Sequence, residues 1–206
     1  WVVTLAVPPR ILPKLDLSRQ SGAASIPDSC RTMVVVPALL GSSHDVVSLL
    51  RQIELHYLRN PDLNLFFALL TDFGDAAQQH MPGDAALLEQ QQAGIVSLNE
   101  RYAALTGREG QDGPFCMFHR ERLWNETENR WMGWERKRGK LHELNRWLRG
   151  ATDTSIVSFI GPVTELRRVK YVITLDSDTI LGRDGAQELV GTLAHPLNHA
   201  QADPGT

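Results

Sequence analysis

Two carboxylates one residue apart form the strongest chemical signal in the sequence. Asp176 and Asp178 directly follow the apolar run 170–175, which is typical of a buried strand. Where a chain leaves a parallel sheet, both side chains can turn toward one ligand. Hard oxygen ligands of this kind suit Mg²⁺ or Mn²⁺, and such a cation can neutralise a diphosphate. Because Asp-x-Asp is common in loops, a solvated turn before the next helix is the alternative interpretation.

Cations and indoles gather in a second segment, residues 119–150. This segment holds nine of the 21 Lys and Arg residues and four of the five tryptophans. Cations at the start of a helix can bind phosphate, and indole faces can stack on bases or sugars. For each tryptophan taken singly, a position in the core is favoured. Five glutamates dilute the charge, so nucleic acid is not expected as a partner.

Asp72 and Asp75 follow another apolar run, residues 64–70. They fit a contact with a nucleotide base or ribose, and they fit equally well a role in shaping the turn. The Gly139-Lys140 pair is not a P-loop, because five residues separate Gly133 from Gly139 and leucine follows the lysine.

The elements that must position these residues alternate along the chain. Short apolar runs predict strands at 32–37, 64–70, 115–118 and 170–175. Apolar residues that recur every three or four positions predict helices in between, the first after a capping serine at 42–43 and the last over 184–194. Loops are expected at 107–114 and 150–169. This alternation predicts an α/β domain with a mostly parallel sheet, whose ligands bind beyond the carboxyl ends of the strands.

The composition bounds the class of protein. The chain has 206 residues, 42 % hydrophobic and 22 % charged, which is enough for one domain with a core. A net charge of -3 gives no reason to expect nucleic acid. Two cysteines, Cys30 and Cys116, are too few for a disulfide framework or a four-ligand zinc site. No apolar run reaches the roughly 20 residues that cross a bilayer.

The ends of the chain predict a piece of something larger. Residues 1–7 are apolar and cations follow, which fits the cytoplasmic exit of a membrane helix and fits a first strand equally well. We expect residues 1–30 to be a lead-in or linker after a membrane helix. Residues 31–206 are then expected to form the α/β domain itself.

The order of the motifs resembles that of family-two-like glycosyltransferases. In that order a strand ends in proline, here Val36-Pro37, and a second strand ends in an acidic turn, here at Asp72. A Gly-Lys segment follows, here Gly139-Lys140, and a strand with Asp-x-Asp comes last. Longer strings, residues 53–60, 114–150 and 171–179, resemble the synthase domain of the cyclic β-1,2-glucan synthases. The resemblance covers nearly all of residues 31–198, with Ala38 and Gly182 as departures from the family pattern.

The resemblance implies a type-A, Rossmann-like glycosyltransferase fold, incomplete in this chain, on the cytoplasmic face of a bacterial inner membrane. It implies that residues 31–206 are the nucleotide-sugar-binding part of that domain, truncated before its acceptor-binding half. It implies inverting transfer of glucose from UDP-glucose to a protein-linked β-1,2-glucan acceptor. Asp178 would bind Mg²⁺ or Mn²⁺ with help from Asp176, Lys140 would lie near the diphosphate or sugar, and Asp72 near uracil. The general base is expected beyond residue 206, so that this chain alone is expected to be inactive.

Two other classes of function remain as alternatives. Haloacid-dehalogenase-like phosphatases share the Asp-x-Asp tripeptide, but they carry it after their first strand and have Thr or Val where this chain has Ile180. A degenerate sugar- or nucleotide-binding module would keep the binding cradle without turnover.

Overall fold

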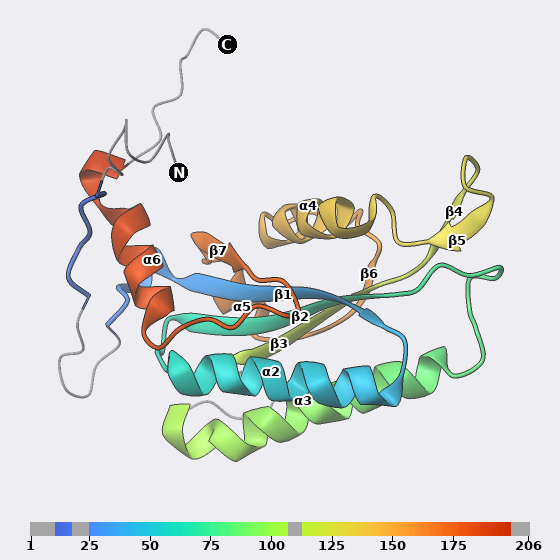
Figure 1. The fold of residues 1–206 in the computed structure, drawn as a ribbon, viewed down its shortest axis with the longest axis horizontal. Coiled ribbons are helices and arrows are strands. Elements are labelled where there is room, and N and C mark those ends of the chain that lie inside the picture. The colour runs from blue at the N-terminus through green and yellow to red at the C-terminus, as the bar shows by residue number, and fades with distance from the viewer. Residues whose placement is uncertain (1–10, 18–24, 107–112, 199–206) are drawn as a thin grey trace, which may run out of the picture.

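The protein has the predicted α/β architecture, built around a central sheet. The computed structural model describes residues 11–17, 25–106 and 113–198, and its main sheet has the strand order β6-β3-β2-β1-β7. These strands are β1 (Thr32–Leu40), β2 (Leu65–Phe73), β3 (Phe115–Arg120), β6 (Ile156–Ile160) and β7 (Tyr171–Thr174). In this sheet, β3, β2, β1 and β7 pair in parallel with their neighbours. Strand β6 pairs antiparallel with β3. The prediction of a mostly parallel sheet is therefore confirmed (Figure 1).

Helices cover both faces of this sheet. Helices α2 (Ser43–Arg59) and α3 (Asp84–Thr106) lie on one face, and α4 (Arg136–Leu148) lies on the other (Figure 1). The smaller elements are η1 (Asp28–Cys30), α5 (Val163–Leu166), α6 (Gly185–Ala194), η3 (Pro196–Asn198) and a hairpin of β4 (Leu123–Asn125) and β5 (Arg130–Met132). In the described part of the chain, no helix is both long enough and apolar enough to cross a membrane.

The apolar run of β1 shows why the sheet is covered on both sides. Side chains alternate along a strand, so Val34 and Val36 enter the core under α2 and α3, while Met33 and Val35 enter the core under α4. A strand buried on both faces must therefore be continuously apolar, as this one is.

Helix α2 begins where its sequence predicts, and Asn60 fixes its other end. The Ser42 hydroxyl accepts a hydrogen bond from the Asp45 amide at 3.2 Å, which satisfies one of the free donors of the first turn. At the other end, the Asn60 side chain accepts from the Ala186 amide and donates to the Gly182 carbonyl. Asn60 thus ties the end of α2 to the beginning of α6.

Two sequence-based expectations about the fold are wrong. Residues 150–169 are not simply a loop, because they contain β6 and α5. Strand β6 is a half-buried edge strand whose sequence, IVSFI, does not alternate between apolar and polar residues, and it pairs with β3. Trp147 is buried as expected, but Trp124 and Trp134 are 46 % and 43 % exposed and are not core residues.

Parts of the expected lead-in pack onto the domain. Ile26 is fully buried, and the Leu15 amide donates to the Gly191 carbonyl of α6 at 3.0 Å. Residues 1–10, for which a membrane-helix exit is one interpretation, lie outside the described residues, as do 18–24, 107–112 and 199–206.

Candidate functional site

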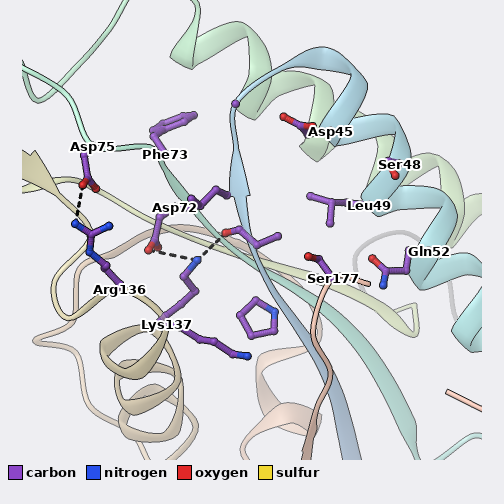
Figure 2. Close-up of a pocket in the computed structure, with 16 residues that line it drawn as sticks. Asp45, Ser48, Leu49, Gln52, Asp72, Phe73, Asp75, Arg136, Lys137 and Ser177 are labelled. Atoms are coloured by element: carbon purple, nitrogen blue, oxygen red, sulfur yellow. Dashed lines mark hydrogen bonds and ion pairs between the residues drawn. The ribbon is translucent and has the colours of Figure 1, made fainter. Parts of the chain in front are cut away.

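A cavity of about 610 Å³ opens at the carboxyl ends of β1 and β2. Its walls come from the ends of these two strands, the first half of α2, the beginning of α4 and the turn after β7 (Figure 2). This is the edge at which open parallel sheets bind their ligands. Of the four predicted site residues, Asp72 and Lys140 line the cavity, and Ser177 lines it from between the other two.

Asp72 is buried in an ion pair. Its side chain is 3 % exposed, and the fully buried Arg120 donates Nε to Oδ1 at 2.9 Å and Nη2 to Oδ2 at 2.8 Å. The two residues are direct partners in the register of β2 with β3, which brings them together across 48 positions of sequence. The bidentate geometry fixes the orientation of the carboxylate.

Arg120 also supports the floor of the cavity, which Asp72 and Lys140 form, by binding residues in and just before α4. Its Nη1 donates to Glu143 Oε2 at 2.7 Å, and its guanidinium contacts the carbonyls of Trp134 and Arg136. Glu143 in turn accepts from the amide and the hydroxyl of Ser155. Burial alone would raise the pKa of Glu143, but the hydrogen bonds from Ser155 and Arg120 lower it. Glu143 is therefore ionised at neutral pH.

Lys140 completes this buried cluster. Its side chain is 4 % exposed, its Nζ donates to the Ala38 carbonyl at 2.6 Å, and it lies 3.4 Å from Asp72 Oδ2. Burial lowers the pKa of Lys140, and the neighbouring Asp72 carboxylate partly opposes that shift. The three donors of an ammonium group leave one for a ligand in the cavity.

Two glycines allow the first turn of α4 to approach the sheet. A Cβ on Gly133 would lie 2.4 Å from Asp72 Oδ2, and one on Gly139 would lie 2.0 Å from the Trp134 carbonyl oxygen. Between them, Glu135 and Arg136 have positive φ values of 50° and 46°. The glycines that imitate a P-loop in the sequence therefore serve close packing around the cavity floor.

Two cations line the rim of the cavity, each paired with a carboxylate. Arg136 Nη2 lies 3.0 Å from Asp75 Oδ2 (Figure 2), and Lys137 Nζ pairs with Asp176 Oδ1. Both Arg136 and Lys137 are more than half exposed. Such exposed pairs are worth roughly 0–1 kcal/mol each, so a charged ligand can displace them at little cost.

The predicted metal ligands lie on an exposed turn. Asp176 is 61 % exposed, Asp178 is exposed on the same turn, and Asp178 is not among the residues that line the cavity. The preceding strand β7 is half-buried at the edge of the sheet, rather than fully buried as expected. No cluster of three His, Cys, Asp or Glu side chains able to hold a metal occurs within the described ranges. Two exposed carboxylates still fit Mg²⁺ or Mn²⁺ when a diphosphate supplies further oxygens.

The sequence analysis did not identify Arg120 and Glu143, the residues that hold Asp72 in place beneath the cavity. Arg120 and Glu143 were visible only as part of a mixed-charge segment, because nothing in their spacing shows that they are buried. Lys137 is exposed on α4, yet it lines the cavity and pairs with Asp176.

The sheet order and the cavity define the class: a mixed α/β protein whose mostly parallel sheet is consistent with an incomplete Rossmann-like glycosyltransferase fold. No family model matches the chain. Over 183 residues, 88 % of its length, the chain is 48 % identical to cyclic beta-(1,2)-glucan synthase NdvB of Rhizobium meliloti (strain 1021). The match spans only 6 % of that protein's length. The resemblance to cyclic β-1,2-glucan synthases is thus confirmed, for one segment of such a protein.

Proposed function

We propose that this chain binds the nucleotide-sugar donor of a glucan-synthesising glycosyltransferase, and that the donor is UDP-glucose. One observation carries the proposal. At the mouth of the cavity, Lys137 pairs with Asp176, so that a cation for a diphosphate and a carboxylate for a metal lie together at the carboxyl edge of the sheet. The identity to a cyclic β-1,2-glucan synthase supports glucan synthesis as the purpose of the site.

The diphosphate would lie between the rim and the floor of the cavity. Lys137 can leave Asp176 for a phosphate oxygen, and Lys140 has one donor left to offer from below. Asp176 and Asp178 would then hold Mg²⁺ or Mn²⁺, which would stabilise the charge that develops on the leaving diphosphate. The helix start of α4 adds its partial positive charge on the same side.

Asp72 is the candidate for the contact with uracil. A carboxylate offers about four lone-pair sites. Arg120 and Lys140 use three of them, which leaves one for a base N–H. Because Arg120 holds the carboxylate rigidly, this acceptor would be pre-oriented, which reduces the entropy lost on binding.

The wider reaction extends this proposal to the whole synthase. Transfer with inversion at the anomeric carbon needs a base within hydrogen-bond reach of the acceptor 2-hydroxyl, and the acceptor would be a protein-linked β-1,2-glucan at the cytoplasmic face of the inner membrane. The base is expected outside these 206 residues.

Calorimetric titration of the chain with UDP-glucose, with and without Mg²⁺ or Mn²⁺, tests the donor and the metal. We expect metal-dependent binding that Asp178→Asn weakens at least about tenfold, by removing a charged ligand. Asp153→Asn makes the same change of charge at an exposed carboxylate beyond the other end of α4, and should leave the affinity unchanged. Equal affinity with and without metal would refute the metal role.

Two further measurements separate the alternative functions. Tighter binding of an aspartyl-phosphate analogue than of UDP-glucose would favour a phosphatase of the haloacid-dehalogenase type. Glucose transfer by a longer chain that contains this segment, lost on Asp178→Asn, would exclude a binding module without turnover.

A further inference from the structure

A second cavity, of about 400 Å³, lies at the opposite end of α4 from the first. The last turn of α4, Gly150 and the segment that leads into β7 form its walls. At the beginning of α4, Arg136, Lys137 and Lys140 line the first cavity, whereas Asn145, Leu148 and the C-cap residue Arg149 line the second. The two cavities are therefore separate, and no motif of the proposed donor site reaches the second one.

Three cations line this cavity, and no carboxylate does. They are Arg149, Arg167 and Lys170. Among the described residues, no ion pair joins any of the three to an acidic side chain. The cations nearby in sequence are different: Arg146 pairs with Asp153, and Arg168 pairs with Asp28. The positive charge of the cavity is thus uncompensated, in a chain whose net charge is -3.

The Arg167 guanidinium is held in place before any ligand arrives. Its carbon lies 4.5 Å from the centre of the Trp147 ring, and its Nη1 donates to the Trp147 carbonyl oxygen. Stacking on an indole is a favourable position for a guanidinium, and it costs less entropy to use a side chain that is already fixed.

Capping of α4 does not account for all three cations. The last carbonyls of the helix already accept backbone N–H groups: Arg149 donates to Asn145 and Arg146, and Gly150 donates to Trp147. The remaining helix-end charge is about half an elementary charge, which one cation can balance. Two cations are therefore in excess of what the helix end requires.

We propose that this cavity binds a small phosphate-bearing anion. A planar guanidinium matches two phosphate oxygens at once, and an ammonium adds a point charge with three donors. Leu148, Val169 and Val172 give the cavity an apolar wall, against which the organic part of a phosphate ester can pack. Attraction between the cations and the phosphate is stronger beside such a wall than in open water.

Titration of the ¹⁵N-labelled chain with inorganic phosphate, followed by amide chemical shifts, tests the proposal. We expect the shifts to centre on Arg149, Gly150 and Lys170. Lys170→Ala should weaken phosphate binding about tenfold, the size of one charge-assisted hydrogen bond. Arg168→Ala removes an adjacent exposed cation that is already paired with Asp28, so it should change the affinity less than twofold. Shifts confined to the first cavity, or equal losses in the two variants, would overturn the proposal.

The source of the phosphate needs a second measurement. Vesicles of phosphatidylcholine with and without phosphatidic acid are mixed with the wild-type chain and with Lys170→Ala. Binding that requires phosphatidic acid and Lys170, and that inorganic phosphate displaces, identifies a lipid headgroup. Phosphate binding without vesicle binding identifies a soluble phosphate ester. Absence of both kinds of binding refutes the site.

Discussion

His119 makes the stability of this domain depend on pH above the range where carboxylates titrate. The side chain is 1 % exposed on β3, its Nδ1 lies 2.9 Å from the Thr71 hydroxyl, and its ring packs 4.3 Å from that of Phe73. Its Nε2 has no hydrogen-bond partner in the described structure. A proton on that nitrogen would be buried without an acceptor. Burial lowers the pKa of His119 to about 4, although Asp72 partly opposes the shift.

The size and sign of the effect follow from this pKa. In the unfolded chain the histidine has the ordinary pKa of about 6.5, so below that pH the unfolded state binds a proton that the folded state does not. Stability therefore falls as the pH falls from about 6.5 toward about 4, at up to about 1.4 kcal/mol per pH unit. Between pH 7 and pH 5 the loss from His119 alone is about 2 kcal/mol.

Urea denaturation at pH 7 and pH 5 measures this loss, with His119→Asn as the test variant. An asparagine amide can keep the contact with Thr71, but it does not titrate. The variant should be less stable at pH 7, since it leaves space beside Phe73, yet its change in stability between the two pH values should be smaller by about 2 kcal/mol. His56, whose pKa is also lowered by burial and by Arg59, contributes equally to both proteins and cancels. The same pH dependence in wild type and variant would refute the reasoning.

Three substitutions around the first cavity give distinct outcomes. Arg120→Met leaves Asp72 buried without its main partner, so we expect a loss of about 3–5 kcal/mol in urea denaturation, and a loss below 1 kcal/mol would contradict the buried cluster. Gly133→Ala places a methyl group 2.4 Å from Asp72 Oδ2 and should weaken UDP binding more than Gly74→Ala, where a Cβ has open space. Lys137→Ala should weaken UDP binding about tenfold while stability changes by less than about 0.5 kcal/mol, and unchanged affinity in calorimetry would remove Lys137 from the site.

The sequence predicted the elements whose side chains are buried throughout, as in β1, or at regular intervals, as in α2. Strand β1 and helix α2 were found because Val34 to Val36 must fill two cores and because Ser42 caps the helix that follows. Strand β6 and the β4–β5 hairpin were not predicted. Edge strands and short hairpins bury too few side chains to constrain their amino-acid composition. Their structure depends on partners far away in the chain.

The candidate site was predicted in part, for a related reason. Asp72 lies near the carboxyl end of a strand, Lys140 lies in the first half of a helix, and the Asp176–Asp178 turn follows a strand, so position alone suggests a ligand. Arg120 depends on the register of two strands instead, and no local pattern shows that it is fully buried. The sequence could show which groups carry charge, but not which charges already compensate one another.

That compensation decides how the first cavity can bind an anion. Lys140 is held in a buried cluster in which two cations face two carboxylates, and separating a buried pair costs about 3–5 kcal/mol. Lys137 is held only by an exposed pair with Asp176, which costs about 1 kcal/mol or less to break. An incoming diphosphate would therefore draw on Lys137, and the same exchange would release Asp176 for a metal. The buried cluster around Asp72 and Lys140 thus fixes the geometry of the cavity, and the exposed Lys137 supplies the positive charge that can move to the ligand.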